Sequence, residues 1–142
     1  KMLSHFKKNG FHYLSNTMPL SKSRWPDGSD IEIFTVKGLK KVNDLAIKKL
    51  DRENVTNLFW KEKKLFKSKN FYKKKNLSMF RYSLDYKNDL NLLKGVVNKL
   101  NKDKAYGTAD QICKIISKSS KFMKIMKKNK FLYSLKRPDL YE

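Results

Sequence analysis

The sequence predicts a mostly α-helical protein: an antiparallel two-helix hairpin with an additional C-terminal helix and an extended irregular N-terminal arm. Turn-forming Gly and Pro residues are concentrated before residue 42, which is typical of an irregular arm. Apolar residues then recur at intervals of about three and four in three segments, the period of helices packed on one face. Helix-start signals precede two of these segments. We therefore divide the chain into an arm at 1–41, a hairpin core at 42–104 and a C-terminal helix with a basic tail at 105–142.

The N-terminal arm carries most of the residues that interrupt regular structure. These are Gly10, Pro19, Pro26, Gly28 and Gly38. Ile31 and Ile33 stand at alternate positions, which predicts one short strand or extended strip within the arm. Trp25 lies in a turn. It either packs against this protein's own helices or inserts into RNA or a neighbouring protein.

The first long helix is predicted over 51–70. Asp51 is the expected N-cap, and Glu53 places a negative charge in the first turn, where the helix dipole favours it. Glu62 interrupts the apolar face. That face comprises Val55, Leu58, Phe59, Leu65 and Phe66. The remaining faces are rich in lysine, so one side of this helix is predicted to be strongly basic.

Two further helices are predicted. The second runs over 88–104 with a narrow apolar seam made of Leu90, Leu93, Val97 and Leu100, the pattern of a helix with one partner. The third begins after Thr108, which forms a capping-box pattern with Gln111. It is expected to bury Ile112, Ile115, Ile116, Met123 and Met126. This helix either docks onto an assembly or packs on the first two helices.

The net charge is +21, from 34 Lys and Arg against 13 Asp and Glu. Self-repulsion of this size is usually tolerated because a polyanion neutralises it. Nucleic acid is the leading candidate, since phosphate neutralisation releases counterions. An anionic membrane surface is the alternative, but it normally needs a strongly amphipathic helix or a lipid anchor. Only four cations are Arg, which favours contact with the backbone over reading of bases, although AT-rich codons would also give many Lys.

The segment between the first two helices alternates basic and aromatic residues over 71–86. Cations of such a loop can follow a nucleic-acid backbone while aromatic faces stack on unpaired bases. Aromatic side chains that fold back onto the helices would give the same composition. Both interpretations stay open at this point.

The sequence lacks the residue patterns of common catalytic and metal sites. His5 and His12 have no metal-ligand spacing, and the lone Cys113 excludes a zinc finger. The acidic turn around Asp27 and Asp30 is read as solvated. No glycine-rich phosphate loop occurs. We therefore predict no enzyme, no cofactor, no metal and no small-molecule substrate. No apolar run reaches the length of a transmembrane helix, and a first residue other than Met suggests a removed N-terminal segment or a trimmed chain.

Residues 43–104 resemble the family of large-subunit ribosomal protein twenty-nine, in its mitochondrial branch. An acid–Leu pair precedes a capped helix and then a Leu–aromatic–aromatic group. The matching residues are Asp44-Leu45, Leu50-Asp51-Arg52-Glu53-Asn54-Val55 and Leu58-Phe59-Trp60-Lys61-Glu62-Lys63. The seam of the second helix has the family's spacing. The loop between the helices is longer than in bacterial members, and Asp103 and Lys104 stand where an apolar pair is expected.

The resemblance implies a structural constituent of the mitochondrial large ribosomal subunit near the peptide tunnel exit. Its partners would be ribosomal RNA and neighbouring ribosomal proteins, in the mitochondrial matrix, with a plastid as the alternative. We expect RNA contacts from Arg24, Trp25, Lys61, Lys63, Lys64, Lys67, Lys69, Lys73, Lys74, Lys75 and Arg81. The competing hypotheses are a peripheral accessory subunit of an organellar membrane complex and a non-specific DNA-binding chromatin protein. The scarcity of Arg argues against the latter.

Overall fold

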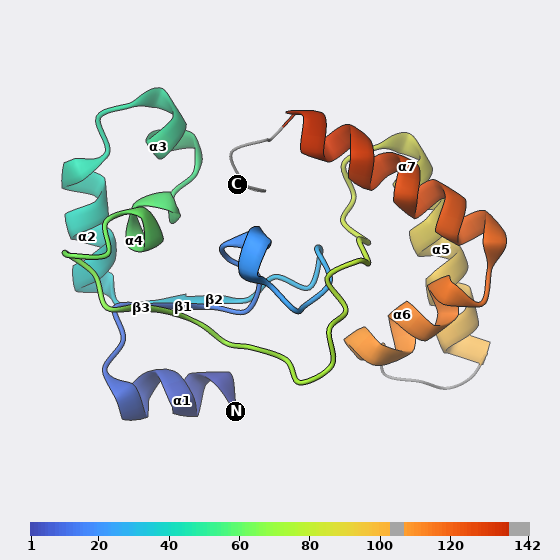
Figure 1. Cartoon of the computed structure of the whole chain (residues 1–142), viewed down its shortest axis with the longest axis horizontal. Coiled ribbons are helices and arrows are strands. Elements are labelled where there is room, and N and C mark those ends of the chain that lie inside the picture. Colours follow the sequence, from blue (N-terminus) through green and yellow to red (C-terminus); the bar gives the residue numbers. More distant parts are fainter. Residues whose placement is uncertain (103–106, 137–142) are drawn as a thin grey trace.

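The chain forms an α/β structure with two lobes, one built around a small sheet and the other from three helices (Figure 1). This computed structural model describes residues 1–102 and 107–136. Residues 103 and 104, where the second helix was predicted to end, and Arg137 of the basic tail lie outside the described residues. None of the described helices is long and apolar enough to cross a membrane.

The sheet lobe holds the elements from α1 to β3. In chain order they are α1 (Met2–Asn9), β1 (Tyr13–Ser15), the 3-10 helix η1 (Leu20–Lys22), β2 (Glu32–Phe34), α2 (Val36–Leu45), α3 (Lys49–Glu53), α4 (Asn57–Lys61) and β3 (Ser68–Asn70). The strand order is β2-β1-β3. β1 pairs with β2 in the antiparallel sense and with β3 in the parallel sense. A mixed sheet therefore replaces the expected irregular arm.

Aromatic stacking holds α4 on one face of this sheet. Tyr13 is in register with Phe34 on β2 and Ser68 on β3, so their side chains share a face. The Tyr13 and Phe34 rings stack on Phe59 of α4, with centroids 5.0 and 5.9 Å away. The core of the lobe consists of Tyr13, Val42, Ala46, Leu58, Phe59 and Phe66.

Helix α2 begins at a side-chain cap and approaches α4 closely. Thr35 accepts a hydrogen bond from the Gly38 amide at 3.0 Å through its hydroxyl, which pairs one of the free N–H groups of the first turn. A Cβ on Gly38 would lie 2.8 Å from Phe59 Cε1. Glycine at this position therefore lets the two helices pack with the aromatic ring between them.

The helical lobe consists of α5 (Lys87–Lys102), α6 (Ala109–Ser117) and α7 (Ser120–Lys136). The Thr108–Gln111 capping box is present at the start of α6, as the sequence predicted. The lobe buries a separate core made of Leu77, Phe80, Tyr82, Leu92, Val96, Cys113, Ile116 and Met126. The predicted third helix is interrupted near Lys118, which divides it into α6 and α7.

The predicted mostly α-helical hairpin is wrong. Residues 51–70 form the end of α3, α4 and β3 instead of one helix, and the N-cap of α3 is Lys48, not Asp51. The apolar period was already broken at Glu62, which is the C-cap of α4. β3 is then stabilised by pairing with the distant β1, a non-local contact that a helical period does not reveal.

The second helix forms, and Leu93 and Leu100 of the predicted seam pack against the core of the lobe, but the most deeply buried positions are different ones. Leu90 and Val97 are 42% and 50% exposed, whereas Leu92 and Val96 are buried. Helices α6 and α7 both pack on α5. Two partners require a wider apolar face than one partner does, and the buried positions are rotated accordingly.

Replacement of Gly28 by a residue with a side chain should lower the free energy of unfolding more than the same replacement at Gly10. Gly28 has φ +96°, and a Cβ there would lie 2.6 Å from the Ser83 amide nitrogen. Gly10 also has a positive φ, +58°, but nothing lies within 4 Å of its Cβ position. We expect Gly10→Ala to cost about 1 kcal/mol of unfolding free energy and Gly28→Ala more than about 2 kcal/mol. Urea unfolding of both variants measures this, and equal losses would contradict the close contact with Ser83.

Candidate functional site

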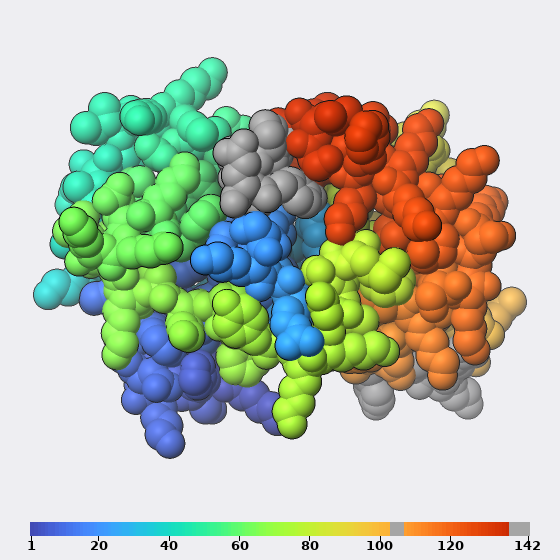
Figure 2. Space-filling view, viewed as in Figure 1, coloured from blue at the N-terminus to red at the C-terminus, as the bar shows by residue number. Residues whose placement is uncertain are grey.

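A basin of about 560 Å³ opens on the sheet lobe between η1, the end of α4 and β3. In Figure 2 the blue surface near η1 and the green surface of the segment after α4 lie side by side on the visible face. The basin is lined by Tyr13, Met18, Pro19, Ser21, Lys22, Trp60, Lys61, Lys63, Ser68, Lys69, Asn70 and Tyr72. These residues come from four separate segments that the sheet brings together.

The parallel pair of strands positions the walls of the basin. Because β1 and β3 run in the same direction, the segments that leave their carboxyl ends lie next to each other, where open α/β sheets commonly bind ligands. The Asn70 amide nitrogen donates to the Met18 carbonyl at 2.8 Å and joins the two segments. The Ser68 hydroxyl donates to the Phe59 carbonyl. That bond fixes the end of α4 against β3, so Trp60 and Lys61 stand at the rim.

Two buried polar atoms of the basin lack a hydrogen-bond partner among the described residues. They are Trp60 Nε1, a donor, and Asn70 Oδ1, an acceptor. Buried polar atoms are nearly always paired, by protein or by water, because an unpaired one costs about 1–3 kcal/mol. A bound group with both acceptor and donor atoms would pair them. Five other buried side-chain atoms of the described residues also lack a hydrogen-bond partner, so the feature is shared with other parts of the chain.

The electrostatic character of the basin is cationic. Lys22, Lys61, Lys63 and Lys69 line it and are exposed. No Asp or Glu is among the described residues that line it. Lys61 lies 3.9 Å from Asp51, a long and largely solvated pair. The arrangement therefore suits a ligand with several negative charges.

Aromatic side chains also line the basin, and the buried Tyr13 among them stays uncharged. The Tyr13 hydroxyl donates to Glu32 Oε1 at 2.8 Å. Burial, followed by the charge of Glu32, raises the pKa of Tyr13 far above its usual value. Tyr13 therefore remains a protonated donor to Glu32 and does not act as a base. Trp60 and Tyr72 add ring surface to the walls.

A buried arginine connects the two lobes. Arg81 is 1% exposed. Its Nη1 lies 3.1 Å from Asp89 Oδ1, its Nε lies 3.4 Å from Asp27 Oδ2, and its Nη2 pairs with Asp85. The Asn129 amide of α7 donates to Asp89 Oδ1 at 2.7 Å. We call Arg81, Asp27, Asp85, Asp89 and Asn129 the arginine node.

The carboxylates of the arginine node differ in how easily they ionise. Burial and the charge of Asp30 raise the pKa of Asp27 to about 6, although Arg81 opposes the shift. Burial also opposes ionisation of Asp89. Hydrogen bonds from Asn129 and from two backbone amides outweigh it and hold the Asp89 pKa below its usual value.

Within the described residues no group of three or more His, Cys, Asp or Glu side chains is arranged to hold a metal ion.

The structure places the eleven predicted RNA-contact residues in three different settings. Lys61, Lys63 and Lys69 line the basin. Arg24, Lys64, Lys74 and Lys75 are exposed elsewhere. Arg81 has almost no exposed surface because it is enclosed in the arginine node.

Trp25, Lys67 and Lys73 contact this chain itself. The Trp25 indole nitrogen donates to the Phe71 carbonyl at 2.7 Å, and Lys73 Nζ lies 4.9 Å from the Trp25 ring centroid. Lys73 also pairs with Asp110 at 2.6 Å. The Lys67 ammonium donates to the Asn9 carbonyl at 2.6 Å.

Sequence reasoning missed Lys22, Trp60 and Asn70 as basin residues. Lys22 lay in the supposed irregular arm, and the other two in a supposed helix. The charge of Lys22 and the aromatic ring of Trp60 were visible, but their convergence depends on the parallel pairing of β1 and β3. That pairing joins residues more than fifty positions apart, as in the bond between Asn70 and Met18.

No protein-family description and no curated protein sequence matches the chain. Its fold is similar to the structure of a cytidylyltransferase from Leptospira borgpetersenii serovar Hardjo-bovis (strain JB197), with 22% sequence identity and a TM-score of 0.66. The match covers 89% of this chain and 50% of that chain. The chain therefore spans half the length of that structure, and at this identity the likeness establishes a shared fold.

This likeness corrects the predicted function. A structural rRNA-binding role, the absence of enzyme activity and the absence of a small-molecule substrate were all inferred for a helical hairpin. The similar fold is an α/β fold that belongs to a cytidylyltransferase. The membrane-complex and chromatin alternatives are corrected by the same finding. High positive charge alone indicates an anionic partner and does not specify the class of that partner.

The raised pKa of Asp27 predicts how stability changes with pH. The folded pKa, about 6, exceeds the unfolded value, so the folded state binds a proton more readily and Asp27 makes folding more favourable as pH falls from about 7 to about 5. Asp30, Arg81, Asp85 and Lys130 are the charged groups that act on it.

Relative to Asp27→Asn, the unmodified protein should gain unfolding free energy over this interval with a slope approaching about 1 kcal/mol per pH unit. Urea unfolding of both proteins at several pH values measures the difference. Parallel pH profiles would contradict a raised Asp27 pKa.

Proposed function

We propose that the basin binds the phosphates of a nucleotide and that the chain is one half of an enzyme that transfers a cytidylyl group. The fold similarity extends over 89% of the chain. The observation that carries the proposal is the unpartnered Trp60 Nε1 in a lysine-lined basin. The mitochondrial location stays a prediction from the sequence.

In cytidylyl transfer the protein contributes mainly by neutralising the negative charge of the phosphates, and it need not form a covalent bond itself. An acceptor oxygen forms a bond to the α-phosphorus of CTP, loses its proton, and the bond from that phosphorus to the bridging oxygen breaks. The electron pair of that bond leaves with pyrophosphate. Cations placed around the leaving group stabilise the charge that develops on it.

The basin offers groups suited to that leaving group. Lys22 and Lys63 contribute ammonium groups from η1 and from the segment after α4, and Lys69 contributes one from β3. Lysine binds phosphate as a flexible point charge. Trp60, which lines the basin, adds a buried neutral donor in its Nε1. Together they would hold a pyrophosphate group by charge and orient it by one directional hydrogen bond.

Charge removal in the basin should weaken nucleotide binding. We expect the double variant Lys22→Gln/Lys63→Gln to bind CTP and pyrophosphate roughly tenfold more weakly. Each lost ion pair contributes about 0.7 kcal/mol, and the two together give the roughly 1.4 kcal/mol that corresponds to a tenfold change. Isothermal titration calorimetry measures both affinities. Lys127→Gln/Lys128→Gln, which removes the same charge from the exposed surface of α7, should bind like the unmodified protein. Equal losses in both double variants would indicate a general charge effect and contradict a basin site.

The transfer reaction itself is tested with CTP labelled on its α-phosphorus, in the presence of magnesium and a small-molecule extract as the source of acceptor. Labelled product and pyrophosphate should form in equal amounts, because each transfer releases one pyrophosphate. Conversion of CTP to free CMP without a labelled acceptor product would contradict the assigned reaction class. Absence of CTP and pyrophosphate binding would contradict the proposal as a whole.

A further inference from the structure

A hollow between α2 and α3 lies on the sheet lobe, apart from the basin and from the arginine node. Its volume is about 540 Å³. Figures 1 and 2 show α2 and α3 at the end of the molecule opposite the helical lobe. The hollow is lined by Leu39, Lys40, Val42, Asn43, Asp44, Ala46, Asp51, Arg52 and Val55. We call these residues together with Leu45, Ile47 and Leu50 the end patch.

The end patch exposes several large apolar side chains. Ile47 lies in the connection between α2 and α3 and is 90% exposed. Val55 lines the hollow and is 54% exposed. Leu45 and Leu50, each next in sequence to a lining residue, are exposed as well. An exposed apolar surface of this kind is typical of a contact with another protein.

The charges in the lining of the hollow are balanced. Two lining residues are acids, Asp44 and Asp51, and two are bases, Lys40 and Arg52. Asp44 stands on α2 and Arg52 on α3, so the two walls carry opposite charges. Arg52 donates to a neutral group of its own chain, Asn43 Oδ1, at 2.9 Å. Its positive charge therefore stays available to a carboxylate of another molecule.

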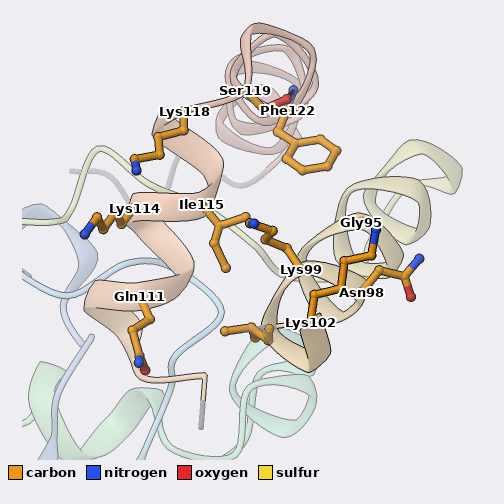
Figure 3. Close-up of a pocket in the computed structure, with 11 residues that line it drawn as sticks. Gly95, Asn98, Lys99, Lys102, Gln111, Lys114, Ile115, Lys118, Ser119 and Phe122 are labelled. Atoms are coloured by element: carbon orange, nitrogen blue, oxygen red, sulfur yellow. Dashed lines mark hydrogen bonds between the residues drawn. The ribbon is translucent and has the colours of Figure 1, made fainter. Parts of the chain in front are cut away.

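The balance matters because the chain carries a net charge of +21, so that two copies repel one another over most of their surfaces. The described residues that line the basin include lysines but no Asp or Glu. The same is true of the hollow between α5 and α6, which Figure 3 shows with Ile115 and Phe122. The end patch, in contrast, offers a second copy both an acid and a base.

We propose that the end patch binds the end patch of a second copy of this chain across a two-fold axis. A two-fold contact requires a surface that is complementary to itself. The end patch meets this requirement with a protruding Ile47 beside a hollow, and with Asp44 opposite Arg52. In the dimer, Ile47 of each copy enters the hollow of the other, and Asp44 of each copy faces Arg52 of the other. The inference is independent of the function proposed for the basin.

Analytical ultracentrifugation of the full chain from about 1 μM to about 1 mM tests the proposal. A reversible equilibrium between monomer and dimer is expected, because a two-fold contact closes on itself. Ile47→Ser should weaken the dimer by more than roughly tenfold, since each dimer loses two buried isoleucine side chains. Leu135→Ser is the matched control, because Leu135 is an exposed apolar residue on α7. It should leave the dimer unchanged.

An exchange of charges tests the contact between Asp44 and Arg52. Asp44→Arg alone and Arg52→Asp alone should each weaken the dimer roughly tenfold, since like charges then face each other. An equimolar mixture of the two variants should recover the affinity as a heterodimer, because each acid again meets a base. A role of these residues within one chain would not give this recovery. Circular dichroism checks that each variant keeps its helices.

Three results would overturn the proposal. The first is a monomer at every concentration, and the second is a dimer that Ile47→Ser leaves intact. The third is a series of species larger than a dimer, because open growth needs a head-to-tail contact instead of a two-fold one. If both charge variants weaken the dimer and their mixture does not recover it, the assigned pairing of Asp44 with Arg52 is wrong.

Discussion

The buried guanidinium of Arg81 is the interaction on which the two-lobe arrangement depends. It lies among carboxylates from three places: the turn at Asp27, the segment at Asp85 and the first turn of α5 at Asp89. Burying a charge is tolerated only when it is paired and hydrogen-bonded. Loss of one partner from such a group typically costs about 3–5 kcal/mol, because the remaining charges stay buried. Arg81 therefore fixes the relative position of the lobes more than it adds net stability.

Hydrogen bonds between backbone groups also fix the residues on both sides of Arg81 to the turn at Asp27. The Asp27 amide donates to the Phe80 carbonyl at 3.1 Å, and the Tyr82 amide donates to the Asp27 carbonyl at 2.9 Å. The Lys130 ammonium of α7 donates to the Ser78 carbonyl at 2.6 Å. The turn around Gly28, the segment before α5 and the last helix are thus joined in one network. Because this network anchors the loop that follows β1, the basin wall formed by Met18 to Lys22 rests on a fixed support.

Local signals predicted the helical lobe better than the sheet lobe. The capping box at Thr108 and the helical period of α5 act within a few residues, and both the capping box and the helix were confirmed, although α5 buries Leu92 and Val96 instead of Leu90 and Val97. The sheet depends on pairing between β1 and β3, which are more than fifty residues apart. Each strand has three residues, too few to show a period of two. The segment 51–70, which contains β3, was therefore mistaken for one long helix.

The site was predicted only in part for a related reason. Three lysines of the basin, Lys61, Lys63 and Lys69, were recognised by their charge, but the pairing of strands that brings them together was not predicted. Arg81 was counted among the RNA contacts, although the acids four and eight residues later, Asp85 and Asp89, indicated an internal partner. Spacing of opposite charges is a signal that could have identified the arginine node. The unpaired Trp60 nitrogen could be found only from the folded chain.

The central claim is that Trp60 Nε1 donates a hydrogen bond to a phosphate oxygen bound in the basin. The indole N–H resonance of Trp60 in a two-dimensional ¹H–¹⁵N spectrum reports on this bond directly. The chain has two Trp residues, and the Trp25 indole already donates to the Phe71 carbonyl. Addition of pyrophosphate should shift the Trp60 indole signal and leave that of Trp25 in place, with the same shift on addition of CTP. An unmoved Trp60 signal at saturating pyrophosphate and CTP would contradict the account.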